Sequence, residues 1–222
     1  MAVGKRTTVW TILGTITGAL GMVLTIISMA TPYWIQSWLD RKTGVDSMGL
    51  WEICFGSDFA APWHVQDDLG RRYADCNHVL SYELRTLRKW LFPVWFIIVE
   101  IMVTGALIAQ LVGLIFAIVY ISSACAPQHE HFTLLVAGIM QSVSGAMLAI
   151  GTMIYAYFSG IDVFWLPSPD SNFLSWSFAL AVVAAGFAFS SAIFHFIDFI
   201  RLKIVVDLER RAETYAPGSS RY

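Results

Sequence analysis

VWTILGTITGALGMVLTIISMAT, residues 9–31, decides the fold class, because these 23 residues include no charged side chain. About 20 consecutive apolar residues suffice to cross the hydrocarbon core of a bilayer. Three further stretches, 91–122, 132–158 and 173–197, are as long and contain a single acidic residue between them, Glu100. In lipid, backbone N–H and C=O groups must be paired within the segment, so each stretch is predicted to be a transmembrane helix.

The composition agrees with a chain that uses the bilayer as solvent. Hydrophobic residues make up 57% of the chain and charged residues 14%, whereas soluble domains have about 45–50% and about 25%. The net charge of −2 gives no reason to expect a nucleic-acid partner. The sequence shows no metal-ligand spacing, nucleophile elbow or phosphate-binding glycine loop. We therefore expect a membrane protein that is not an enzyme and uses no cofactor or metal.

The first stretch also has features of a signal peptide, since Lys5 and Arg6 precede it and Ser28–Ala30 offers small residues for cleavage. Its length exceeds the about 7–15 residues of a usual signal-peptide core. We therefore expect it to be retained as the first span. Cleavage after Ala30 would instead leave three spans, with the two termini on opposite sides of the membrane.

Small residues recur four positions apart in three of the spans. This spacing lets helix backbones approach closely in lipid. It fits packing inside one bundle and also fits a dimerisation face, and the sequence leaves both open. The residues are Gly14 and Gly18, then Gly105, Ala109 and Gly113, and finally Ala181 and Ala185.

Basic residues do not orient the bundle, because seven lie near the termini and seven in the loop 32–90 between the first two spans. This loop approaches the length at which charge no longer governs translocation. Its cysteines, Cys54 and Cys76, fit an oxidising compartment, where a disulfide persists. Closing their 22-residue separation would stabilise the loop by roughly 3 kcal/mol. We therefore expect both termini in the cytosol, and the first and third loops outside the cell.

The loop 32–90 is too long to be a simple connection, and its many aromatic residues predict a folded unit. Short β-prone segments such as Met48–Phe55 have Gly and Asp at their ends, as strands often do. About four antiparallel strands closed by one disulfide are the simplest arrangement. Such a sheet would place its Trp residues near the membrane interface.

One set of residues in and around this loop forms a recognisable motif. They are Trp34, Gly49, Leu50, Trp51, Cys54, Cys76 and, just before the second span, a basic residue that is Arg88 or Arg85, of which Arg88 lies immediately before the apolar run. Their order resembles the W…GLW…C…C signature of the claudin superfamily (PMP22/EMP/MP20/claudin). The resemblance implies an all-α transmembrane fold, a left-handed four-helix bundle with a small extracellular antiparallel β-sheet from the first loop and part of the second. The insert 56–75 is longer than in vertebrate claudins, which makes the chain most similar to invertebrate-type claudin-like proteins.

The resemblance implies one claudin-like domain, residues 1–222, with both short and long extracellular loops. Its segment boundaries follow from the apolar stretches. In order, they are the span 9–31, the first extracellular loop 32–90, the span 91–122, the cytosolic turn 124–130, the span 132–158, the second extracellular loop 159–172, the span 173–197 and the cytosolic tail 198–222.

The resemblance also implies a function at the plasma membrane, at tight or septate cell junctions. The protein would form or regulate a paracellular barrier or ion pathway through side-by-side and cell-to-cell association. Its partners would be other claudin-like subunits in the same and the opposing membrane, together with the lipid bilayer. The long insert and an unusual C-terminus also fit an alternative role, that of an auxiliary regulatory subunit of an ion channel or receptor.

Candidate site residues lie in the two extracellular loops. In claudins, charges beside the disulfide set ion preference, which points here to Asp67 and Asp68, although paired charges in a solvated loop give the same pattern. The second loop of claudins meets the opposite cell, and exposed aromatics concentrate binding energy in such contacts. The same aromatics also fit the belt at the outer leaflet. These candidate contact residues are Asp162, Phe164, Trp165 and Pro167.

Two further features lie on the cytosolic side. Cys125, next to the second span, is a candidate for S-palmitoylation and equally fits a free thiol. The chain ends in Ser219-Ser220-Arg221-Tyr222, whereas junctional claudins commonly end in Tyr-Val, which a PDZ groove captures. A cytosolic scaffold would therefore meet an atypical ligand here.

Overall fold

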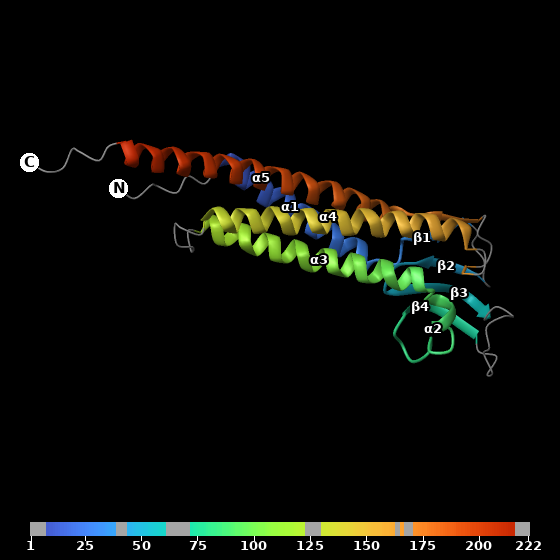
Figure 1. Ribbon diagram of the computed structural model, residues 1–222. Coiled ribbons are helices and arrows are strands. Elements are labelled where there is room, and N and C mark those ends of the chain that lie inside the picture. Colours follow the sequence, from blue (N-terminus) through green and yellow to red (C-terminus); the bar gives the residue numbers. More distant parts are fainter. Residues whose placement is uncertain are drawn as a thin grey trace, which may run out of the picture.

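The structure, a computed structural model, describes residues 8–38, 44–60, 72–122, 130–162, 165–166 and 171–215. Four long helices lie side by side in one bundle, and a small sheet lies at one end of it (Figure 1). In chain order the elements are α1 (Val9–Ala30), β1 (Ile35–Ser37), β2 (Val45–Met48), β3 (Glu52–Ala60), β4 (Arg72–His78), α2 (Arg88–Leu91), α3 (Val94–Ile121), α4 (Glu130–Ile161), β5 (Asn172–Leu174) and α5 (Trp176–Tyr215).

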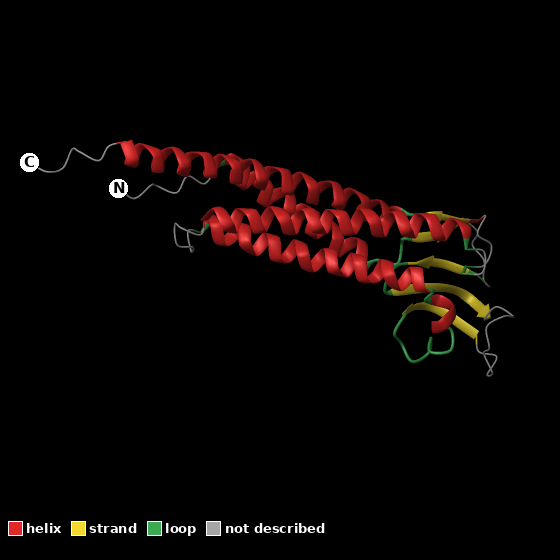
Figure 2. Ribbon diagram, viewed as in Figure 1, coloured by secondary structure: helices red, strands yellow, loops and turns green. Residues whose placement is uncertain are grey.

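The predicted fold class, a four-helix transmembrane bundle with a small antiparallel sheet, is confirmed. Helices α1, α3, α4 and α5 are all long and apolar enough to cross a membrane. The strands gather at one end of the bundle, beside the ends of the helices (Figure 2). The start of α1 and the end of α5 lie at the opposite end (Figure 1). An even number of spans accounts for this arrangement.

Helix α1 illustrates the membrane character of the bundle. Large apolar side chains such as Ile16, Leu20 and Val23 are about half exposed. In water the apolar face of a helix is buried, whereas in lipid the small residues face the neighbouring helix. All buried positions of α1 are small or carry a hydroxyl: Thr11, Gly14, Gly18, Gly21, Thr25 and Ser28.

The regularly spaced small residues lie inside this bundle. Helix α1 packs along α5, and α4 packs along both α3 and α5. A methyl group added at Gly18 would come within 2.9 Å of the Gln141 amide nitrogen and of the Ser191 hydroxyl. One added at Gly14 would come within 2.9 Å of the His195 ring. Both positions are therefore used for packing within one chain.

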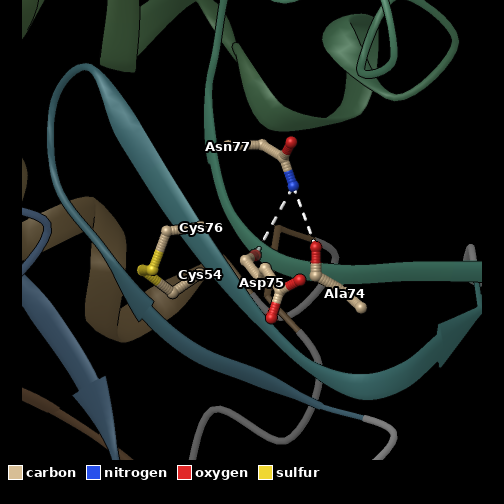
Figure 3. Close-up of a disulfide and its surroundings, with 5 residues drawn as sticks. All are labelled: Cys54, Ala74, Asp75, Cys76 and Asn77. Carbon is tan, nitrogen blue, oxygen red and sulfur yellow. Dashed lines mark hydrogen bonds between the residues drawn. A yellow bond between two sulfur atoms is a disulfide. The ribbon is translucent and has the colours of Figure 1, made fainter.

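The sheet has five strands, in the order β4-β3-β2-β1-β5, and every pairing is antiparallel. Strand β5 comes from the second loop and pairs with β1, so the expected contribution of that loop is present. Cys54 on β3 lies opposite Cys76 on β4, and a disulfide joins them (Figure 3). The bond therefore crosslinks the outer strand β4 to the rest of the sheet.

The pairing of β3 with β4 is irregular next to the disulfide. Phe55 pairs with Asp75 and Phe59 pairs with Tyr73, so β3 uses two more residues than β4 over this stretch. Asp75 has φ of 61°, in the left-handed region that Asp and Asn tolerate better than most residues. The Asn77 side-chain amide donates hydrogen bonds to two nearby backbone carbonyls, at 3.0 and 3.5 Å (Figure 3). These bonds stabilise the bulged strand.

Candidate functional site at the sheet end of the bundle

Trp34 attaches the sheet to the helices. Its side chain is completely buried, and its indole Nε1–H donates to the Ser28 carbonyl in the last turn of α1, at 2.8 Å. The ring packs edge to face with Tyr155 of α4 and Phe178 of α5. Its backbone N–H donates to the Met48 carbonyl at the end of β2. Through its side chain and its backbone, this one residue thus links two helices, the end of a third and the sheet.

The Gly49-Leu50-Trp51 motif forms the tight connection between β2 and β3. The Gly49 N–H donates to the Glu52 carbonyl at 2.8 Å. A methyl group on Gly49 would come within 2.4 Å of the Thr31 carbonyl oxygen, so only glycine fits beside the end of α1. Leu50 is completely buried in the core. Trp51 is half-buried and stacks on the His78 ring, with centroids 6.3 Å apart.

Arg88 holds the segment between β4 and the long helix α3. Its guanidinium donates to the backbone carbonyls of Leu80 and Ser81, at 3.2 and 3.4 Å. Arginine suits this position because its planar group presents several donors at once. The last motif residue therefore braces a loop next to the sheet.

The charges near the disulfide are unevenly balanced on the described strands. Asp58 on β3 and Arg72 on β4 form an exposed ion pair at 3.6 Å. Asp75 is exposed next to Cys76, and within the part of the chain that the structure describes it has no ion pair. The predicted charge residues Asp67 and Asp68 lie outside the described residues.

The second loop differs from the expectation of exposed contact residues. Only 2% of Trp165 is exposed, and its indole N–H donates to the Leu91 carbonyl at 3.2 Å. Its ring packs against Trp95 and Tyr155. The Asp162 carboxylate accepts a hydrogen bond from the Trp95 indole at 3.1 Å. The prediction that Trp165 forms an exposed contact, or part of a lipid-facing belt, is therefore wrong.

The remaining predicted positions lie outside the described residues: Phe164 and Pro167 of the second loop, Cys125, and the C-terminal tetrapeptide. Among the residues that the structure does describe, no group of three or more His, Cys, Asp or Glu side chains is arranged to hold a metal.

A buried polar contact between α1 and α5 was not anticipated from the sequence. His195 and Asp198 are only 1% exposed, although their position near the end of a span favours contact with lipid headgroups. The Thr11 hydroxyl donates to the Asp198 carboxylate, and the Ser191 hydroxyl donates to the Gly14 carbonyl at 2.7 Å. The available signal was spacing, because 191, 195 and 198 share one helical face.

Four lipid-exposed helices with a disulfide-linked sheet at one end define the class, a multi-pass membrane protein. The family model for PMP-22/EMP/MP20/Claudin tight junction proteins matches residues 19–196. The chain therefore belongs to the PMP-22/EMP/MP20/Claudin family, which confirms the resemblance read from the motif. No curated protein sequence matches the chain significantly. The more specific similarity to invertebrate-type members stays a prediction.

Proposed function

We propose that this protein is a claudin-like subunit of cell–cell junctions, where it forms or regulates a paracellular barrier or ion pathway. The observation that supports this most directly is the sheet, which the family motif attaches to the bundle at the end opposite the start of α1 and the end of α5 (Figure 1). Membership of the PMP-22/EMP/MP20/Claudin family supports the same role. In this orientation the sheet lies in the extracellular space and both termini lie in the cytosol, since disulfides persist in oxidising compartments.

The sheet end offers surfaces for association. Three large side chains are strongly exposed there: Trp38 (74%), Tyr82 (76%) and Leu80 (57%). They lie at the two edges of the sheet, with Trp38 beside β5 and with Leu80 and Tyr82 just after β4, and exposed large apolar side chains are common at protein contacts. The Trp38 ring packs against Phe173 of β5 in a tilted arrangement, with ring centroids 4.2 Å apart, so its orientation is fixed before any partner binds. A fixed aromatic residue binds with a small loss of conformational entropy.

The exposed carboxylate of Asp75 supports a role in the selection of ions that pass between cells. Its carboxylate is exposed on β4, beside the disulfide and separate from the Asp58–Arg72 pair. Acidic side chains that line a narrow aqueous path favour cations. Asp67 and Asp68 lie outside the described residues, so Asp75 is the first residue to substitute in a test of charge selectivity.

The deciding experiment uses a polarised epithelial layer that expresses the tagged protein. We expect the protein at cell–cell contacts and a change in transepithelial resistance when it is removed. Among cells with equal surface expression, the double variant Trp38→Ser/Tyr82→Ser should show reduced junctional enrichment, whereas Glu83→Gln at another exposed position should not. Protein spread evenly over the membrane with unchanged resistance would contradict the junction role. Co-purification with a pore-forming protein would then favour the auxiliary-subunit role.

A further inference from the structure

A groove lies where the sheet meets helices α1 and α3. It has a volume of about 430 Å³, within the range of small-molecule sites. Its lower part is apolar and its upper part carries an aromatic ring, a carboxylate and an imidazole. The lining residues are Ile26, Met29, Ala30, Trp51, Glu52, His78 and Leu107.

The lower part of the groove faces the bilayer. Ile26 and Ala30 are exposed near the end of α1, where the apolar span stops. Leu107 comes from the lipid-exposed helix α3. Lipid chains contact these side chains without any loss of hydrogen bonds. The groove therefore opens at the level where the acyl chains and headgroups of one leaflet meet.

The upper part carries a negative charge, for which the described residues provide no positive partner. Glu52 is half-buried, and its carboxylate has no hydrogen bond or ion pair to any residue that the structure describes. Trp51, its neighbour, lines the same groove, and one face of its ring stacks on His78. A carboxylate beside a tryptophan ring attracts a quaternary ammonium group, because both the charge and the ring face are electron-rich.

His78 adds a hydrogen-bond donor. The Leu80 N–H donates to its Nδ1 at 3.2 Å, so the neutral ring carries its proton on Nε2. An Nε2–H at the groove can donate to a phosphate oxygen. The groove thus offers a carboxylate that attracts a cation and an N–H that donates a hydrogen bond to an anion, and both lie above apolar side chains.

We propose that this groove binds one zwitterionic phospholipid of the choline type. One acyl chain lies against Ile26 and Leu107, the trimethylammonium group lies by Glu52 and Trp51, and the phosphate accepts a hydrogen bond from His78. An anionic lipid fits less well, because Glu52 repels it and none of the described residues that line the groove is a lysine or arginine. A sterol fits less well, because its hydroxyl leaves the Glu52 charge without a counter-ion.

The test is photo-crosslinking of the full-length protein in dodecyl maltoside with a phosphatidylcholine that carries a diazirine on one acyl chain. Mass spectrometry of the peptides locates the label. We expect labelling near residues 26–30 and 107, and competition by unlabelled phosphatidylcholine at about threefold lower concentration than by phosphatidylglycerol with the same chains. Glu52→Gln should remove this about threefold preference, which is the size expected for one partly exposed charge pair. Glu83→Gln, the matched control at an exposed position, should keep it.

A second variant tests the apolar lining of the groove and leaves the Glu52 carboxylate in place. Leu107→Trp fills the groove and should reduce the labelling of residues 26–30, whereas Ile115→Trp on the exposed face of the same helix should not. Equal competition by both phospholipids, or labelling spread evenly over the faces of α1 and α3, would overturn the proposal in favour of an unselective lipid surface. Stronger competition by cholesterol would overturn it in favour of a sterol site. None of these readouts depends on the junction role.

Discussion

The indole nitrogen of Trp165, from the second loop, donates a hydrogen bond to the backbone carbonyl of Leu91, at the end of α2, over 3.2 Å. Leu91 lies two residues before Pro93, which caps the long helix α3. The bond therefore joins the second loop to the end of the first loop, about seventy residues earlier in the chain. Together with β5, it makes the two loops one structural unit at the end of the bundle.

Trp165 should accordingly be required for stability. Replacement by alanine should lower the free energy of unfolding by about 3–5 kcal/mol, as for other fully buried aromatic side chains. Phenylalanine should cost about 1–3 kcal/mol, because the Leu91 carbonyl loses its donor while most of the packing stays. The measurement is the denaturant midpoint of the purified protein in a nonionic detergent.

The control for Trp165 is an exposed aromatic residue of the same region. Tyr82→Ala should change stability by no more than about 0.5 kcal/mol, because its side chain is 76% exposed. Equal effects of the two substitutions would mean that Trp165 is not buried in the folded protein.

Gly49→Ala should destabilise the protein through a steric clash. The added methyl group meets the Thr31 carbonyl at 2.4 Å and the Pro32 Cα at 2.8 Å, and both are backbone atoms that cannot rotate away. Overpacking of this kind costs about 1–3 kcal/mol. Gly160→Ala is the matched control, because nothing lies within 4 Å of its added methyl group and alanine favours a helix. A thermal unfolding curve that shows equal midpoints for the two variants would contradict the assignment.

The bundle and the motif were predictable from the sequence for a simple physical reason. In lipid every backbone group must be paired inside each span, so an uncharged stretch as long as residues 9–31 is expected to form an α-helix. Cys54 and Cys76 then closed a loop long enough to fold. The contribution of β5 to the sheet also agreed with expectation, since a short second loop next to the first has few other ways to pair its backbone.

The environment of single side chains was not predictable in the same way. A tryptophan near the end of a span has the same local pattern whether it faces lipid, a neighbouring cell or the protein core, and only tertiary contacts place Trp165 in the core. The groove residues Glu52 and His78 were missed because they lie on different strands, 26 positions apart. Their proximity depends on the β3–β4 register, in which they pair directly.

Asp75 allows the effect of charge to be separated from the effect of backbone conformation. Asp75→Asn and Asp75→Gly both remove the carboxylate, and both residues tolerate the observed φ of 61°. Asp75→Val disfavours it and should cost about 1–2 kcal/mol of stability. If the proposed paracellular role holds, Asn and Gly should lower the permeability of cations relative to anions, measured as a dilution potential across an epithelial layer. An unchanged potential with normal surface expression would exclude Asp75 from the ion path.

Gly18 distinguishes packing within the chain from a dimerisation face. Its position leaves no room for a larger side chain, because Gln141 and Ser191 lie within 2.9 Å of an added methyl group. Gly18→Val should therefore lower the thermal midpoint of the monomer, with a cost of about 1–3 kcal/mol. Ile16→Val, a conservative change on the exposed face of α1, should leave the midpoint unchanged. If Gly18 formed a dimer contact instead, Gly18→Val would shift the size-exclusion profile from dimer to monomer without lowering the midpoint, because the monomer would lose none of its own contacts.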